Sequence, residues 1–120
     1  MSWSFNNVEP VSIQIARRLR QDILRGRFQT NEQIPPVRQL AFEASVNPNT
    51  MQKALVKLEE EGLLHTRGTV GRFVTSDCEA LARARETLRR ESVIGWIREA
   101  EALGMSREEM IRYINKEGNS

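Results

Sequence analysis

One short segment, residues 48–58, carries side chains whose types and spacing suit contact with nucleic acid. At about 100° per residue, an α-helix here gathers one apolar face, made of Met51, Ala54, Leu55 and Leu58. The opposite face holds Val56 and five polar residues, Asn49, Thr50, Gln52, Lys53 and Lys57. Amides and hydroxyls can hydrogen-bond base edges, while ammonium groups neutralise phosphates. We therefore expect these five polar residues to contact DNA.

A second basic feature follows in residues 63–75. Residues 63–66 and 72–75 are candidate strands, and the two glycines between them, Gly68 and Gly71, permit positive φ at a hairpin tip. Arg67 and Arg72 flank this tip and can lie along a phosphate track or a minor groove. Because an isolated two-stranded hairpin is only marginally stable, we expect this one to pack on helices.

The same residue types argue against catalysis. The chain has one histidine, one cysteine, no clustered metal ligands and no phosphate-binding loop. His65 is expected to be a half-exposed strand residue and Cys78 an inert thiol. A lone cysteine cannot form an internal disulfide, which fits a reducing cytoplasm. We predict no enzyme activity, no metal site and no cofactor.

Three helices must position these side chains. Residues 11–25 place apolar residues on one face, residues 27–35 are expected to be a connecting loop, and residues 37–45 form a second amphipathic helix. Asn47 has the type of an N-cap and Pro48 that of a first helical residue, so a third helix begins there. Its acidic end, Glu59 to Glu61, is expected to be solvated.

The order of helix, helix, tight turn, helix and β-hairpin predicts a mainly α fold with a small β-hairpin, a winged helix-turn-helix. In this arrangement the third helix enters the major groove of a duplex, which is about 12 Å wide and admits one α-helix. Periodicity alone also allows a plain helical hairpin in a three-helix core. We expect residues 1–76 to form the winged helix-turn-helix domain.

Residues 77–120 are predicted to be a two-helix dimerisation tail. A long helix spans residues 77–103, and Ser106 and Glu109 form a capping box that begins the last helix. This segment is too short for a sizeable core of its own, so its apolar residues need a partner. A second copy of the chain would cover Leu88, Val93, Trp96, Ile97, Ala100, Met110, Ile111 and Ile114. The alternative is that the tail folds back on its own domain.

Charge and hydropathy are consistent with a cytoplasmic nucleic-acid-binding protein. Residues 1–76 hold ten Lys/Arg and seven Asp/Glu, a net +3, whereas residues 77–120 hold eight and nine, a net −1. This basic excess agrees with DNA binding by the first part, although it is small. No apolar run approaches the roughly 18 residues of a membrane span, and no signal peptide is seen at the start.

Three stretches together resemble the DNA-binding domain of the GntR family of bacterial repressors. They are Ile34-Pro-Pro-Val-Arg-Gln-Leu-Ala41, Val46-Asn-Pro-Asn-Thr50 and Leu58-Glu-Glu-Glu-Gly-Leu63. The short tail resembles that of the YtrA-type subfamily. The resemblance implies a homodimeric regulator, repressor-like, that binds a pseudo-palindromic operator in double-stranded DNA. It leaves a small-molecule effector unidentified, and the polar residues of the tail indicate no pocket for one.

The resemblance also assigns roles to single residues. It implies DNA contact by Arg38, which could instead form a salt bridge with Glu43 or Glu9. It places Asn47, Asn49 and Thr50 at the turn and the start of the recognition helix, and Gly68 at the wing tip. Many relatives have an arginine where this chain has Pro48 and Gln52, so no guanidinium is available there to read guanine. We therefore expect Asn49, Gln52 or Lys53 to read bases, with A·T pairs favoured at some positions. The competing hypothesis is a winged-helix module that binds protein instead of DNA.

Overall fold

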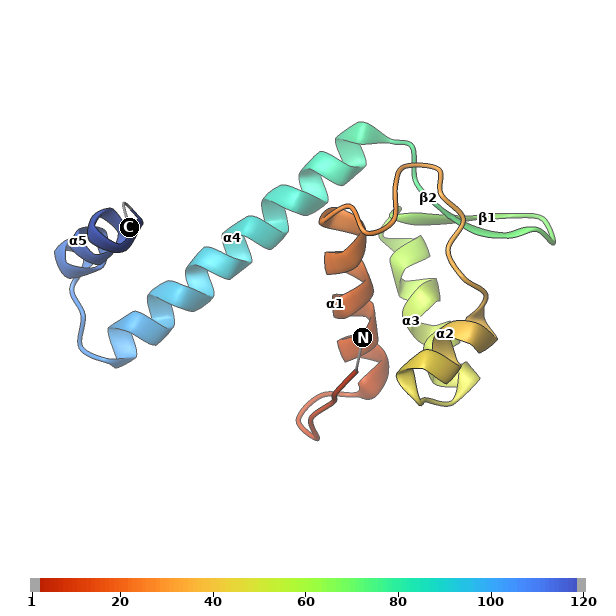
Figure 1. Ribbon diagram of the computed structural model, residues 1–120, viewed down its shortest axis with the longest axis horizontal. Helices are drawn as coiled ribbons and strands as arrows, with labels where there is room; N and C mark the ends of the chain where they lie inside the picture. The colour runs from red at the N-terminus through yellow and green to blue at the C-terminus, as the bar shows by residue number, and fades with distance from the viewer. Residues whose placement is uncertain (1–2, 119–120) are drawn as a thin grey trace. The chain divides into compact units, whose positions relative to one another are not determined.

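The computed structural model describes residues 3–118, which contain five α-helices and one two-stranded antiparallel sheet (Figure 1). In chain order the elements are α1 (Val11–Leu24), α2 (Val37–Ala44), α3 (Pro48–Glu60), β1 (Leu64–Arg67), β2 (Gly71–Val74), α4 (Cys78–Ala102) and α5 (Arg107–Gly118). The predicted mainly α class with a small β-hairpin is confirmed. The chain forms two compact units that meet within α4, between Ala84 and Arg85. This point lies further along the chain than the boundary at residue 76 expected from the sequence.

The core of the first unit is enclosed by α1, α2 and α3. Helix α3 packs against both α1 and α2, and each helix buries the face that its periodicity predicts. The side chains with almost no exposed surface include Ile15, Leu19, Leu40, Met51, Leu55 and Leu58. Burial of each large apolar side chain stabilises the folded state by roughly 1.5–3 kcal/mol. The inner face of α3 is thereby fixed, and its polar face is turned outward.

A tight turn joins α2 to α3. Ser45 ends α2 in the left-handed conformation, with φ of 56°, and the Val46 N–H donates to the carbonyl oxygen of Ala41 at 2.9 Å. The Asn47 side chain then accepts a 2.7 Å hydrogen bond from the backbone N–H of Asn49. This confirms Asn47 as the N-cap and Pro48 as the first residue of α3.

The hairpin of β1 and β2 forms the wing. It packs on this core through Leu64 and Val74, which face each other across the strands and are both buried. The segment before α2 also pairs with the outer edge of β2. The backbone N–H groups of Asn31 and Ile34 donate to the carbonyl oxygens of Val74 and Arg72, each at 3.0 Å. Interpreting residues 27–35 as a simple connecting loop was therefore incomplete, because part of this segment anchors the wing.

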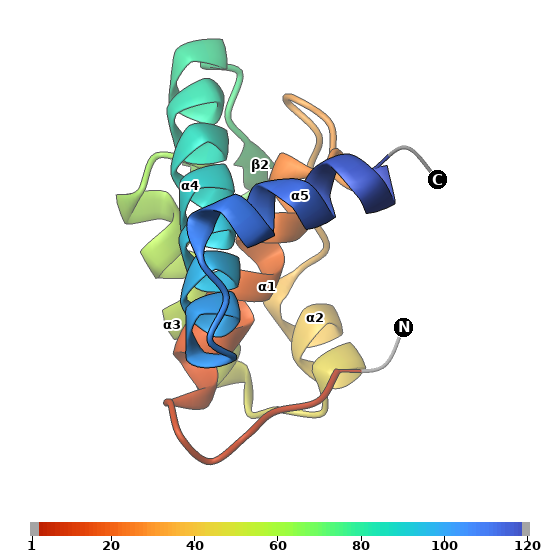
Figure 2. The same cartoon turned by 90° about the vertical axis from the view of Figure 1, so that its left-hand side faces the viewer.

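The helices of the tail begin at side-chain caps. The Asp77 carboxylate accepts hydrogen bonds from the backbone N–H groups of Glu79 and Ala80 at the start of α4. Ser106 and Glu109 exchange reciprocal side-chain-to-backbone bonds of 3.1 and 3.2 Å, which confirms the predicted capping box. The tail therefore has two well-defined helices, α4 and α5, seen from another side in Figure 2.

Candidate nucleic-acid interface

The outer side of α3 presents a polar surface that we call the reading face, made of Asn49, Gln52, Lys53 and Lys57. All four side chains are exposed. The Asn49 side chain forms no hydrogen bond with other residues of the 3–118 region, so its amide is available to a ligand. Thr50, also predicted to contact DNA, is half-buried at the start of the helix. The reading face therefore offers amide groups and two ammonium groups on one helix.

Arg38 adds a third cation, at the start of α2. Its side chain is exposed and forms no ion pair with any residue between 3 and 118. Both carboxylates considered as alternative partners are engaged elsewhere, because Glu9 pairs with Arg17 at 2.8 Å and Glu43 accepts from Gln39. The side-chain oxygen of Asn47 accepts the hydrogen bond of the helix cap, so its amino group remains available for an external contact.

The tip of the wing is shaped by a glycine and a stacked arginine. Gly68 has φ of 47°, in the left-handed region. Arg67 donates a 3.2 Å hydrogen bond to the Asn31 side chain and lies over the Phe73 ring, 4.2 Å from its centroid. Its guanidinium therefore stays near the wing surface, and its charge remains exposed to solvent.

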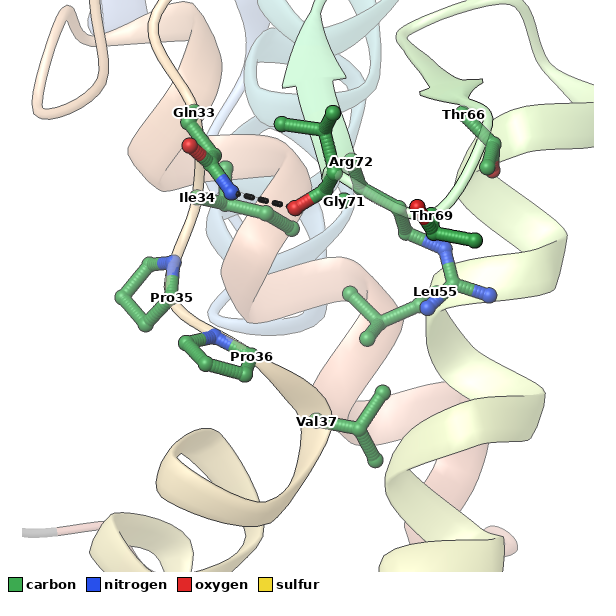
Figure 3. Close-up of a pocket in the computed structure, with 11 residues that line it drawn as sticks. Gln33, Ile34, Pro35, Pro36, Val37, Leu55, Thr66, Thr69, Gly71 and Arg72 are labelled. Carbon is green, nitrogen blue, oxygen red and sulfur yellow. Dashed lines mark hydrogen bonds between the residues drawn. The ribbon is translucent and has the colours of Figure 1, made fainter.

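Arg72, which was predicted to accompany Arg67 at a basic tip, is tied to α3 instead. Its Nε donates to the Glu59 carboxylate, and its Nη1 donates to Gln52 Oε1 at 3.3 Å. The side chain is only 15% exposed, and Figure 3 shows it directed toward α3. The guanidinium of Arg72 thus attaches the wing to α3.

This contact also overturns one expectation from the sequence. The acidic run at the end of α3 was interpreted as a solvated helix end, yet Glu59 pairs with Arg72 and Glu61 accepts two bonds from Arg20 of α1, at 2.6 and 2.7 Å. Two of the three carboxylates therefore join α3 to its neighbours. The partners lie 13 and 41 residues away along the chain, so no local pattern identifies them.

A small open groove of about 330 Å³ lies where the wing, α3 and the segment that enters α2 come together (Figure 3). Its apolar lining includes Ile34, Pro35 and Leu55, and its polar lining includes Thr66 and Arg72. The Gln33 side chain crosses one side and donates a 2.8 Å hydrogen bond to the Val70 carbonyl oxygen. Sequence reasoning missed Gln33, because an isolated glutamine in a loop carries no recognisable signal.

The predicted dimer residues of the tail differ in exposure. Four of them, Val93, Trp96, Ile111 and Ile114, are exposed within a single chain. Leu88 and Ile97 are partly covered, and Ala100 and Met110 are buried inside the chain.

Neither a metal site nor a membrane helix is found in the described part of the chain. Within residues 3–118, no three His, Cys, Asp or Glu side chains gather as metal ligands would. None of the helices in the same range combines the length and the apolar character that crossing a bilayer requires.

Comparisons with known proteins point to one family. Residues 12–74 match the family model described as bacterial regulatory proteins, gntR family. The HTH-type transcriptional regulator YhcF of Bacillus subtilis is 30% identical over 114 residues, which cover 95% of this chain and 94% of that protein. The transcriptional repressor YtrA of the same organism is 28% identical over 108 residues, 89% of this chain and 83% of YtrA.

Solved structures agree with these relatives. A GntR family transcriptional regulator from Listeria monocytogenes has a TM-score of 0.84 at 27% identity, and the match covers 93% of this chain and 98% of that one. The DNA-binding domain of AraR, solved in complex with operator ORX1, shares the fold with a TM-score of 0.57 at 23% identity. That match covers 62% of this chain and 95% of the AraR domain.

Proposed function

Because the chain belongs to the GntR family of bacterial regulatory proteins, whose members are DNA-binding transcriptional regulators and not enzymes, we propose that it represses transcription from a specific operator. The observation that carries this proposal is the joint exposure of the reading face on α3 and of Arg38 beside it. Together they place amides for base edges and cations for phosphates on adjoining helices of a helix-turn-helix.

The proposed docking places α3 in the major groove and the wing against the neighbouring backbone. Lys53, Lys57 and Arg38 neutralise phosphates, while Asn49 and Gln52 face base edges. Arg67 and the Gly68 backbone follow the adjacent phosphate track or minor groove. The AraR domain, which shares this fold and is solved on its operator, supports such a docking by analogy. Asn47 and Thr50 contribute at the entry of the helix.

The protein acts as a homodimer in this proposal. Val93, Trp96, Ile111 and Ile114 leave apolar surface exposed on the tail, and a second copy would remove it from water. Two-fold symmetry would set two α3 helices about 34 Å apart, or a multiple of that distance, and would require a pseudo-palindromic operator. Repression is proposed because YtrA, which matches most of this chain, is named as a repressor. The site of action is the cytoplasm, where the DNA is.

Selection from a random pool of double-stranded DNA tests this function. The full chain is incubated with the pool at moderate salt, and bound duplexes are sequenced over several rounds. The proposal predicts enrichment of one motif with two related half-sites in opposite orientation. Enrichment of no motif, with weak binding to every duplex, would instead favour a module that binds protein.

A further inference from the structure

One guanidinium on the wing, that of Arg72, forms hydrogen bonds with two side chains of α3. Arg72 donates from Nε to Glu59 and from Nη1 to Oε1 of Gln52. Residues 52 and 59 are seven positions apart, about two helical turns, so they lie on the same side of α3. Arg72 is 15% exposed and Glu59 29% exposed. The ion pair therefore fixes the guanidinium, and the guanidinium in turn contacts Gln52.

This contact determines which end of the Gln52 amide is free. A guanidinium has only donors, so the atom that faces it must be the amide oxygen and not the amino group. The Gln52 side chain is otherwise exposed on the reading face. Its oxygen is thus engaged from the wing side, and its amino group, with two donor hydrogens, is the part that remains for a ligand.

A glutamine in this state suits guanine better than adenine. Recognition of adenine uses both ends of the amide, since the oxygen accepts from the N6 amino group while the amino group donates to N7. Here a second donor approaching Oε1 would also approach the positive charge of Arg72. Guanine presents two acceptors in the major groove, O6 and N7, and requires only the amino group that Gln52 keeps free.

We propose that Arg72 is a positioning residue that orients the Gln52 amide, and that Gln52 thereby selects a G·C base pair in the operator. The inference rests on the proposed function, because it concerns how the same reading face chooses its bases. The sequence left open which of Asn49, Gln52 and Lys53 reads bases and at which positions A·T pairs are favoured, and this inference assigns a G·C pair to Gln52. It also gives Arg72 a role that does not depend on contact with phosphate.

The first step of the test locates the base pair that Gln52 reads. Duplexes carrying the selected motif, each with one symmetric pair of positions changed to the other base pairs, are titrated with the wild-type chain and with Gln52→Ala. The position at which Gln52→Ala loses discrimination is the one Gln52 contacts. At that position the wild-type protein is expected to bind the G·C duplex about fivefold or more tighter than the A·T duplex.

The second step asks whether Arg72 sets that preference. Arg72→Lys keeps the charge but loses the planar fork that joins Glu59 to Gln52. It should reduce the G·C preference at this position to less than about twofold, or invert it, and should leave other positions unchanged. Arg20→Lys is the matched control, because it makes the same exchange in the ion pair that joins α1 to Glu61 at the end of α3. It should keep the full preference. Adding Arg72→Lys to Gln52→Ala should change the base preference no further.

Two results would overturn the inference. One is a preference of the wild-type protein for A·T at the position that Gln52 contacts. This result can be obtained even if the Arg72→Lys protein does not fold. The other is an unchanged preference in a folded Arg72→Lys protein. Either result would leave sequence-specific binding intact, so the proposed function would stand. Failure to select any motif would contradict the proposed function itself.

Discussion

The side-chain amide of Gln33 donates a 2.8 Å hydrogen bond to the carbonyl oxygen of Val70. This bond ties the tip of the wing to the segment that leads into α2, on the side opposite to the contact between Arg72 and α3 (Figure 3). The pairing of Ile34 with Arg72 through the backbone, at 3.0 Å, runs alongside it. The wing is therefore held from both sides before any ligand arrives.

Loss of the Gln33 contact should loosen the wing. Gln33→Ala removes one hydrogen bond to a carbonyl group and is expected to lower the free energy of unfolding by about 0.5–1.5 kcal/mol. Urea denaturation at one fixed protein concentration measures this change. Gln29→Ala, in the same connecting segment, is the control, because the side chain of Gln29 forms no hydrogen bond within residues 3–118. A cost for Gln33→Ala no larger than that of the control would contradict the anchoring role.

The side chain of Gln33 also occupies the space beside Gly71. Gly71 has φ of 141°, and a Cβ atom there would lie 2.7 Å from Gln33 Nε2. Gly71→Ala should therefore lower the free energy of unfolding by about 1–3 kcal/mol, through backbone strain and displacement of Gln33. Combined with Gln33→Ala it should cost less than the sum of the two single changes, because the hydrogen bond can be lost only once. Fully additive costs would show that the two residues act independently.

Two neighbouring asparagines should separate stability from binding. Asn47→Ala removes the cap of α3 and is expected to destabilise the fold by about 0.5–2 kcal/mol. Asn49→Ala removes an exposed amide of the reading face, so it should leave the unfolding free energy nearly unchanged and weaken binding to the selected duplex. Thermal or urea unfolding and a DNA titration on both variants give the comparison. Equal loss of stability in the two would contradict this division of roles.

The sequence could predict the helices and caps because their signals are local. Asn47 with Pro48, and Ser106 with Glu109, lie within four residues of the groups they bond, and burial of Met51 and Leu55 follows from their spacing. The contacts that hold the wing against α3 and against the segment before α2 could not be predicted in this way. Arg72 meets Glu59 and Gln33 meets Val70 only after the chain has folded, and any exposed arginine or glutamine looks alike in a sequence.

The tail offers a test of dimerisation. Trp96 is 39% exposed in a single chain, and placing a charge there should prevent a second copy from covering it. Trp96→Asp is expected to sediment as a monomer at micromolar concentrations where the wild-type chain is a dimer, with unchanged helical content by circular dichroism. Arg98→Ala, about 160° away around α4, is the control and should remain dimeric. A wild-type chain that sediments as a monomer would refute the dimer.

The central claim is that the reading face and Arg38 bind DNA. The most direct measurement is titration of the selected duplex with the wild-type chain and with the triple variant Arg38→Ala, Asn49→Ala and Lys53→Ala. Arg98→Ala, Arg107→Ala and Asn115→Ala together form the matched control, because they remove the same two charges and one amide from the tail. We predict that wild-type affinity falls steeply with added salt, that the triple variant binds at least about 100-fold more weakly, and that the control binds like the wild type. Unaltered binding by the triple variant would contradict the account.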